Sequence, residues 1–270
     1  MPESAVLYEK KDGVAVVTMN RPEFRNAINP EMLCRLADAW QDVNDDVDVR
    51  VAILTGAGDK AFCAGADLDR LVRMMQGLRP PETEYDQRLK DDLSIIYKGL
   101  LRNYQVTKPL IAAVRGFCVA GGTELLSTTD IRIAGDDARF GLAEVKWSLF
   151  PMGGSTVRLP RQISYCNAME ILLTGEQLSA ERALQMGLIN KVVPPDQVMP
   201  EAWRYADIMR NNGPLAVQAV KRSVLAGFGL PPEQALEKEM EIGIPVSMSE
   251  DCKEGTKAFK EKRKPVFKGR

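Results

Sequence analysis

Apolar and polar positions in the first part of the chain alternate between strand-like and helix-like patterns. Short apolar runs flank the turn signal Asp12-Gly13, which predicts a β-hairpin. Pro30 then stands at the first position of a segment whose apolar residues recur at helical spacing to about residue 43. Because the apolar run 51–54 follows, the pattern predicts a β-α-β unit by residue 55.

The same alternation continues to about residue 195 and then gives way to helical patterns alone. Apolar runs at 110–114, 131–134 and 140–144 predict further strands. Four helical segments separated by Gly or Pro are predicted at 201–211, 214–226, 232–242 and 250–262. The sequence therefore predicts an α/β core over residues 1–198 and a helical C-terminal region over residues 199–270.

Glycine-rich turns follow several of the predicted strands. Gly121-Gly122 stands between the strand predicted at 110–114 and a helical turn, and GAGDKAFCAGAD (56–67) follows another strand. Unpaired N–H groups at a strand-to-helix turn stabilise negative charge, and small residues let a ligand approach the main chain. Taken by itself, the loop at 56–67 is better explained as a plain strand-to-helix connection than as a binding loop.

Two glutamates are the candidate chemical groups. Glu124 lies in the predicted helical turn after Gly121-Gly122, and Glu144 follows the next apolar runs. The chain has 0 histidines, which excludes Ser-His and Cys-His nucleophiles and His-ligated metal sites. Proton transfer near neutral pH must then use carboxylates, Lys, Tyr, Cys or water. Two carboxylates beside an anion-stabilising turn indicate acid–base chemistry on a carbonyl compound.

Composition narrows the class of protein further. The 270 residues are 45% hydrophobic with a net charge of −1, which fits a globular protein and gives no electrostatic case for nucleic acid. No run approaches the roughly 18 apolar residues of a membrane span, so no membrane partner is expected. Five scattered cysteines without a CxxC pair favour reduced thiols, and hence a cytoplasmic location. The N-terminus lacks the features of a signal or transit peptide.

Seven motifs in order resemble the enoyl-CoA hydratase/isomerase (crotonase) superfamily over nearly the whole chain. They are NRPEFRNAI (20–28), AFCAGADL (61–68), AAVRGFCVAGGTELLSTTDIRIA (112–134), FGLAE (140–144), FPMGGST (150–156), LTGEQLSAERALQMGLINKVV (173–193) and EGTKAFKEKRK (254–264). The resemblance implies a crotonase-like spiral of ββα repeats carrying the active site in residues 1–198, with a helical trimerisation region in residues 199–270. It also implies an acyl-CoA substrate, a homotrimer or dimer of trimers, and no metal or other cofactor beyond the coenzyme A of the substrate.

The resemblance also implies roles for individual residues. It assigns an oxyanion hole to the backbone N–H groups of Ala66 and Gly121. In the hydratase assignment Glu124 takes a proton from water, while Glu144 delivers a proton to Cα of the acyl group. The implied CoA or substrate contacts are Phe24, Arg25, Ala64, Asp67, Leu68, Gly122, Pro151, Met152 and Lys268.

Both glutamates are retained, which favours an enoyl-CoA hydratase acting in fatty-acid or related acyl-CoA metabolism. The alternatives in the same fold are an enoyl-CoA isomerase, or a dehydratase or lyase acting on a modified acyl-CoA. A non-catalytic acyl-CoA-binding protein is a further alternative. Met152 stands where many hydratases have a glycine, so its side chain is expected to reshape the acyl pocket. Acyl chain length and branching stay open at this stage.

Overall fold

The computed structural model describes residues 4–270, and within that range ten strands form two sheets. The strands of the main sheet are, in spatial order, β1 (Val6–Lys11), β2 (Val14–Met19), β3 (Val51–Gly56), β5 (Leu110–Val114), β7 (Ile131–Gly135) and β10 (Lys191–Val193). Only β1 and β2 pair antiparallel there. The turn joining them places Asp12 and Gly13 at φ +52° and +78°, a left-handed conformation that suits Gly and Asp. The predicted hairpin is confirmed.

The second sheet is smaller and holds the strands that lead into the glycine-rich turns. Its strands are, in order, β4 (Ala61–Cys63), β6 (Phe117–Val119), β8 (Arg139–Gly141) and β9 (Leu178–Ser179). β4, β6 and β8 are parallel, so their carboxyl ends meet at one edge of the sheet. The structure is therefore of the predicted α/β class.

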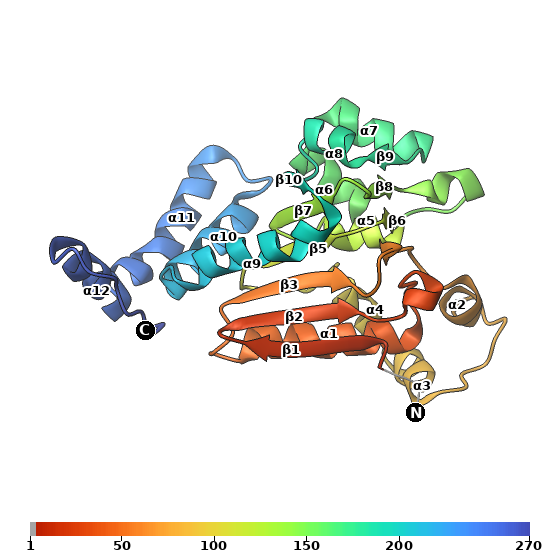
Figure 1. Cartoon of the computed structure of the whole chain (residues 1–270), viewed down its shortest axis with the longest axis horizontal. Helices are drawn as coiled ribbons and strands as arrows, with labels where there is room; N and C mark the ends of the chain where they lie inside the picture. The colour runs from red at the N-terminus through yellow and green to blue at the C-terminus, as the bar shows by residue number, and fades with distance from the viewer. Residues whose placement is uncertain (1–3) are drawn as a thin grey trace.

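Two helices cover opposite faces of the main sheet (Figure 1). α1 (Pro30–Asp45) buries its apolar face in the larger core, and its first turn is capped by Asn29, whose side chain accepts a hydrogen bond from Met32. α9 (Val198–Arg210) packs Ala202 and Ala206 against the other face. The boundary predicted at residue 198 falls at the start of α9, yet α9 covers the sheet.

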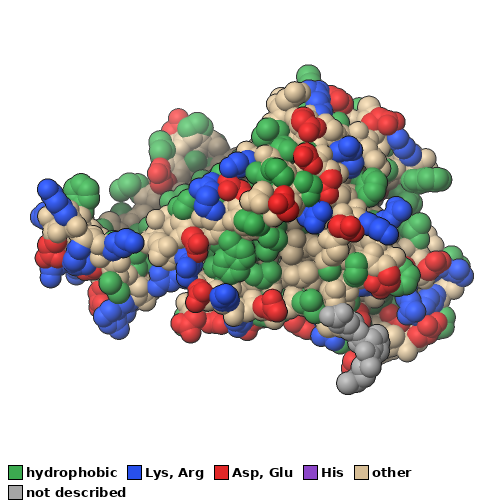
Figure 2. Space-filling model, in the orientation of Figure 1, with side chains coloured by type: hydrophobic (Ala, Val, Ile, Leu, Met, Phe, Trp, Pro, Cys, Tyr) green, Lys and Arg blue, Asp and Glu red, His purple; other side chains and the backbone are tan. Residues whose placement is uncertain are grey.

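Three C-terminal helices project from this body (Figure 1): α10 (Pro214–Gly227), α11 (Pro232–Ser247) and α12 (Glu250–Lys260). Their predicted positions agree with the structure except at the end of α11, which runs past residue 242. The helix continues through Pro245, where the missing N–H removes one main-chain hydrogen bond. Figure 2 shows hydrophobic side chains among the charged ones on this projecting part.

The remaining helices connect the strands and surround the end of the smaller sheet. They are the short turns η1 (Pro22–Phe24), η2 (Leu68–Val72), η3 (Ala143–Trp147) and η4 (Pro195–Gln197), and the α-helices α2 (Arg73–Met75), α3 (Glu84–Asp91), α4 (Ser94–Gly99), α5 (Gly121–Leu126), α6 (Ser155–Gln162), α7 (Tyr165–Thr174) and α8 (Ala180–Gln185). α3 and α4 pack on α1, where Trp40 donates a hydrogen bond to the Gly99 carbonyl. No helix in residues 4–270 has the length and apolar character needed to cross a membrane.

The strand predicted before Glu144 is confirmed, but its end is wrong. Residues 140–144 were expected to form a strand, but β8 ends at Gly141 and Glu144 lies in the first turn of the 3₁₀ helix η3. Gly141 packs so closely on the neighbouring chain that an added Cβ would lie 2.9 Å from the Glu176 carbonyl oxygen. The chain leaves the sheet after this contact, and Glu144 is placed by the connection that follows.

Candidate active site

The two glycine-rich loops meet at the edge of the smaller sheet. β4 and β6 are parallel neighbours, with Ala61 opposite Phe117, so the loops after them leave the sheet side by side. A Cβ atom added to Gly121 would lie 3.9 Å from the Ala66 nitrogen. Within residues 4–270, neither of these two N–H groups donates a hydrogen bond to the protein. They are therefore a pair of adjacent donors available to one acceptor.

Hydrogen bonds on either side of Ala66 fix the direction of its free N–H. The N–H of Ile28 donates to the Gly65 carbonyl at 2.8 Å, and the N–H of Asp67 donates to the Ile28 carbonyl at 2.9 Å. The carboxylate of Asp67 forms a largely buried ion pair with Arg21, with Nη1 and Oδ2 2.9 Å apart. Because the residues on both sides of Ala66 are held in place, its N–H can bind an acceptor without rearrangement of the loop.

The loop before α5 is equally constrained. Ala120 has φ +50°, a conformation that costs a non-glycine residue about 1–3 kcal/mol and is found at functional sites. Gly122 is buried against β4, and a Cβ there would lie 2.4 Å from the Cys63 carbonyl oxygen. The hydroxyl of Thr123 donates to the carbonyls of Cys118 and Gly141, which ties α5 to β6 and β8. The position of the Gly121 N–H is thus set by the surrounding sheet.

Glu124 is buried on α5, and a residue far along the chain bonds its carboxylate. Both the hydroxyl and the N–H of Ser155 donate to Glu124 Oε1, at 2.9 and 3.3 Å. Gly153 lies against the other side, since an added Cβ would be 2.5 Å from Oε2. The sequence prediction missed both of these residues. They lie in the FPMGGST motif, where small residues before a helix were the available signal.

Glu144 has a different environment. It is half-buried in η3, and its buried Oε2 has no hydrogen-bond partner within residues 4–270. Burial raises the pKa of Glu144 to about 7; its own main-chain N–H opposes this rise, and the negative charge of Glu124 adds to it. The negative charge of Glu124 therefore acts on Glu144, as expected of two carboxylates that belong to one site.

The two cysteines beside the loops are not candidate nucleophiles. Cys63 and Cys118 are buried, and burial raises the pKa of Cys63 to about 12 and that of Cys118 well above its ordinary value. A nucleophilic cysteine needs its thiolate, which these surroundings disfavour. Both side chains therefore serve as small apolar packing groups.

The predicted CoA and substrate contacts fall into two groups. One group lies in or beside the loops and includes Ala64, whose N–H donates to the Arg25 carbonyl at 3.0 Å. Of these nearby residues, Phe24, Leu68 and Met152 are exposed, while Ala64, Gly122 and Pro151 are buried or partly buried. Lys268 follows α12 in the chain and lies apart from the loops, because it lines a cavity beside Asp12 and Gly13 of the β1–β2 turn.

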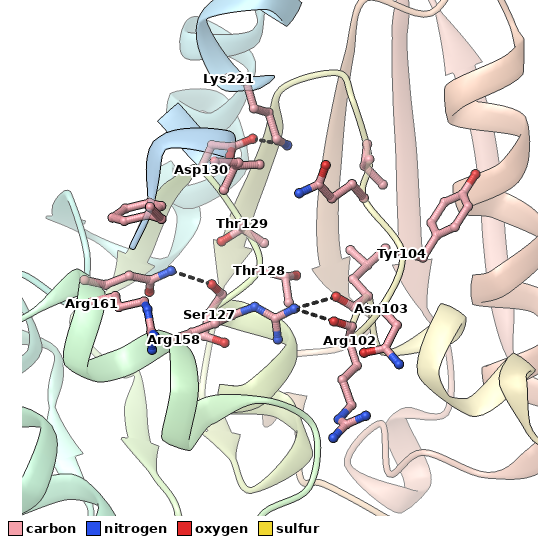
Figure 3. A pocket seen from close by; sticks show the side chains of 16 residues that line it. Arg102, Asn103, Tyr104, Ser127, Thr128, Thr129, Asp130, Arg158, Arg161 and Lys221 are labelled. Carbon is pink, nitrogen blue, oxygen red and sulfur yellow. Dashed lines mark hydrogen bonds and ion pairs between the residues drawn. The ribbon is translucent and has the colours of Figure 1, made fainter. Parts of the chain in front are cut away.

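A cavity of about 380 Å³ lies at the C-terminal end of α5. The two N–H donors and the two glutamates do not line it. Arg158 of α6 lies in its wall and donates to the carbonyls of Leu101 and Arg102, at 2.7 and 3.1 Å (Figure 3). The same guanidinium donates to the Gly153 carbonyl at 3.0 Å. Arg158 therefore anchors the loop that lies against Glu124.

Together these groups are suited to reactions of a carbonyl compound. Adjacent N–H donors stabilise an oxygen that gains negative charge, and a carboxylate with pKa near 7 can deliver or accept a proton at neutral pH. The second carboxylate, held in place by Ser155, can act on the same substrate. The geometry thus fits proton transfers coupled to an enolate-like intermediate.

Known proteins are similar to this chain in sequence and in fold. Residues 9–270 match the profile of the family described as enoyl-CoA hydratase/isomerase. The chain is 47% identical to enoyl-CoA hydratase EchA19 of Mycobacterium tuberculosis, covering 98% of this chain and 96% of that protein. It is 40% identical to (E)-benzylidenesuccinyl-CoA hydratase of Thauera aromatica, covering 98% and 99%. The crystal structure of an enoyl-CoA hydratase from Bacillus anthracis matches with a TM-score of 0.88 and 34% identity, covering 98% of this chain and 100% of that chain.

Proposed function

The chain belongs to the enoyl-CoA hydratase/isomerase family, and from this premise we propose that it is an enoyl-CoA hydratase. It adds water reversibly and with syn geometry across the double bond of a 2-enoyl-CoA thioester. The observation that carries the proposal is the grouping of two carboxylates with two free N–H donors. Relatives named as hydratases at 47% and 40% identity support the same activity.

In the proposed mechanism the thioester oxygen accepts hydrogen bonds from the N–H groups of Ala66 and Gly121. Glu124 takes a proton from water as the water oxygen bonds to Cβ. The electron pair of the double bond then moves toward the thioester, whose oxygen gains negative charge. Glu144 delivers its proton to Cα, and the reverse steps give dehydration. Each proton transfer contributes roughly 10²–10⁴ to the rate, and each oxyanion donor roughly 10²–10³.

The remaining predicted contacts are proposed to bind the CoA part of the substrate. In this proposal Ala64, Gly122 and Leu68 contact it through backbone atoms, and Arg25 supplies a cation. Asp67 contributes through its main chain, because its carboxylate is engaged by Arg21. The proposed chemistry needs water and the two carboxylates, so we propose no metal or redox cofactor.

We further propose that the protein works as a homotrimer or a dimer of trimers. Apolar side chains spaced four residues apart leave an exposed stripe along α11 and its C-terminal end: Leu236, Met240, Ile244 and Met248, the residue that follows the helix. A stripe of this kind on a projecting helix is typical of an interface with another chain. Lys268, remote from the site of its own chain, would then be available to a neighbouring subunit. Sedimentation velocity gives the mass directly, and a monomer at micromolar concentration would contradict this proposal.

The five cysteines support a reducing compartment, which we propose to be the cytoplasm. All five are free thiols in the structure. Cell fractionation of the tagged protein checks this location.

The activity is tested by loss of the enoyl-thioester absorbance of crotonyl-CoA and of longer and aromatic 2-enoyl-CoA substrates. The wild-type protein is expected to hydrate at least one of them, and Glu124→Gln and Glu144→Gln are expected to lose roughly 10²–10⁴ of that rate. If Glu124→Gln loses hydration but still migrates the double bond of a 3-enoyl-CoA, the isomerase alternative is favoured. Tight CoA binding without turnover of any substrate would indicate an acyl-CoA-binding protein.

A further inference from the structure

The carboxylate of Glu124 is held on one oxygen by a single residue, Ser155. Its hydroxyl lies 2.9 Å and its N–H 3.3 Å from Oε1. These are the hydrogen bonds that residues 4–270 give to the Glu124 side chain, so Oε2 carries none of them. Hydrogen bonds to an ionised carboxylate are the strong class, and two from one residue hold this oxygen in place.

Ser155 is not needed at this place to begin the helix. It is the first residue of α6, and the position before it is Gly154, with φ +110° and no side-chain cap. A serine that caps a helix stands before the first turn and bonds the N–H groups of that turn. The Ser155 hydroxyl instead points away from α6 and bonds a carboxylate on α5. Ser155 is also fully buried, so its hydroxyl does not bond to bulk water.

The surroundings hold both partners in this arrangement. Gly153 packs on the Oε2 side of the carboxylate, where any side chain would collide with it. Arg158 bonds the Gly153 carbonyl and the carbonyls of residues 101 and 102, which anchors the loop to a separate part of the chain (Figure 3). The carboxylate can rotate away only if Ser155 moves or releases Oε1.

We propose that Ser155 is a positioning residue for the hydration reaction: it holds Oε1 of Glu124 and so leaves Oε2 free to take the proton from the attacking water. The inference rests on the proposed hydratase function and assigns different roles to the two carboxylate oxygens of Glu124. One oxygen binds the protein, and the other receives the proton. In residues 4–270 the buried Oε2 of Glu144 has no hydrogen-bond partner, and the main-chain N–H that bonds its carboxylate is its own.

The test compares Ser155→Ala with Ser127→Ala in hydration of crotonyl-CoA. Ser127 is the matched control because it is also buried and its hydroxyl bonds Glu124 at 2.6 Å, but through the main-chain carbonyl. Ser155→Ala is expected to lower kcat about 10- to 100-fold, the factor that a hydrogen bond to a charged group contributes, with KM changed less than about twofold. Ser127→Ala is expected to keep kcat within about twofold of wild type.

A conservative variant and a stability measurement separate positioning from folding. Ser155→Thr keeps the hydroxyl and is expected to retain most of kcat, while Ser155→Ala and Ser127→Ala are expected to unfold at similar temperatures. The inference is overturned if Ser155→Ala keeps kcat within twofold of wild type, if Ser127→Ala loses as much, or if Ser155→Thr falls as far as Ser155→Ala. Wild-type hydration alongside any of these results leaves the proposed function intact, whereas a wild-type protein without hydration removes the premise of both.

Discussion

The two sides of the site are built differently. On one side, Glu124 is buried in α5, bonded twice by Ser155 and backed by Gly153. On the other, Glu144 lies in η3, with an unpartnered oxygen and a connection of exposed apolar side chains after it. Of these, Trp147 is 77% exposed.

The contrast suggests that the Glu124 side is built for exact placement and the Glu144 side for accommodating different substrates. A group that must aim one oxygen at a small water benefits from fixed partners in a rigid frame. A group that meets the variable acyl part of a substrate benefits from an open, apolar neighbourhood that different acyl chains can fill. The rigid side should therefore respond sharply to single-atom changes, and the open side should respond gradually and according to substrate.

The largest effect is expected from Gly153→Ala, which removes the space beside Glu124. The new Cβ would lie 2.5 Å from Oε2, and the flexible carboxylate can yield only by leaving its position. We expect kcat for hydration to fall about 10²-fold, within the range for a displaced acid–base group. Gly243→Ala on α11, where an added Cβ meets nothing within 4 Å, is the control. Equal activity in the two variants would remove the contrast between the sides.

The pH dependence is the next largest effect and reports on Glu144. Hydration needs its protonated form, and burial raises the pKa of Glu144 to about 7. The value of kcat/KM for hydration should therefore be level below pH 7 and fall about tenfold per pH unit above it. The value of kcat/KM for dehydration should fall in parallel, because the reaction consumes no net proton and its equilibrium constant does not depend on pH. A hydration profile that is flat from pH 6 to 9 contradicts this role.

The same group should reduce folding stability above neutral pH. The folded pKa of about 7 lies above the ordinary value of 4.5, so the unfolded chain loses this proton first as the pH rises. Stability then falls between pH 4.5 and 7 and stays lower above pH 7. Glu144→Gln should raise the free energy of unfolding at pH 8 by roughly 1–2 kcal/mol, after a discount for partial exposure, and have little effect at pH 4.

Urea unfolding at the two pH values measures this difference. Glu239→Gln, an exposed position on α11, is the control and should give no gain at either pH. A Glu144→Gln gain that is equal at pH 4 and pH 8 would show that ionisation is not its cause.

The smallest effect is expected on the open side, from Trp147→Ala. Stability should stay within about 0.5 kcal/mol, because the side chain is mostly exposed. KM for long or aromatic 2-enoyl-CoA substrates should rise about 3- to 10-fold from lost apolar contact, while crotonyl-CoA kinetics stay within about twofold. Phe259→Ala on α12, also exposed, is the control. A loss of kcat with crotonyl-CoA would place Trp147 on the rigid side instead.

Much of the fold could be predicted from the sequence. The hairpin at Asp12-Gly13, α1 and the buried strands follow from local turn chemistry and apolar spacing, and the structure confirms them. The family resemblance and its fold are confirmed by full-length matches. Glu144 was misplaced on a strand because its short apolar run reads the same whether it stays in a sheet or leaves it.

The chain by itself determined which groups are present: two glutamates, glycine turns after strands, and no histidine to share the proton transfers. These depend on residue type and on neighbours along the chain. Only the tertiary structure decided that Ser155 meets Glu124, that Gly153 must lack a side chain, and that Glu144 is buried enough to hold its proton near pH 7. Contacts between segments distant in sequence, and the loss of water around a carboxylate, arise only when the loops pack together, so no local pattern contains them.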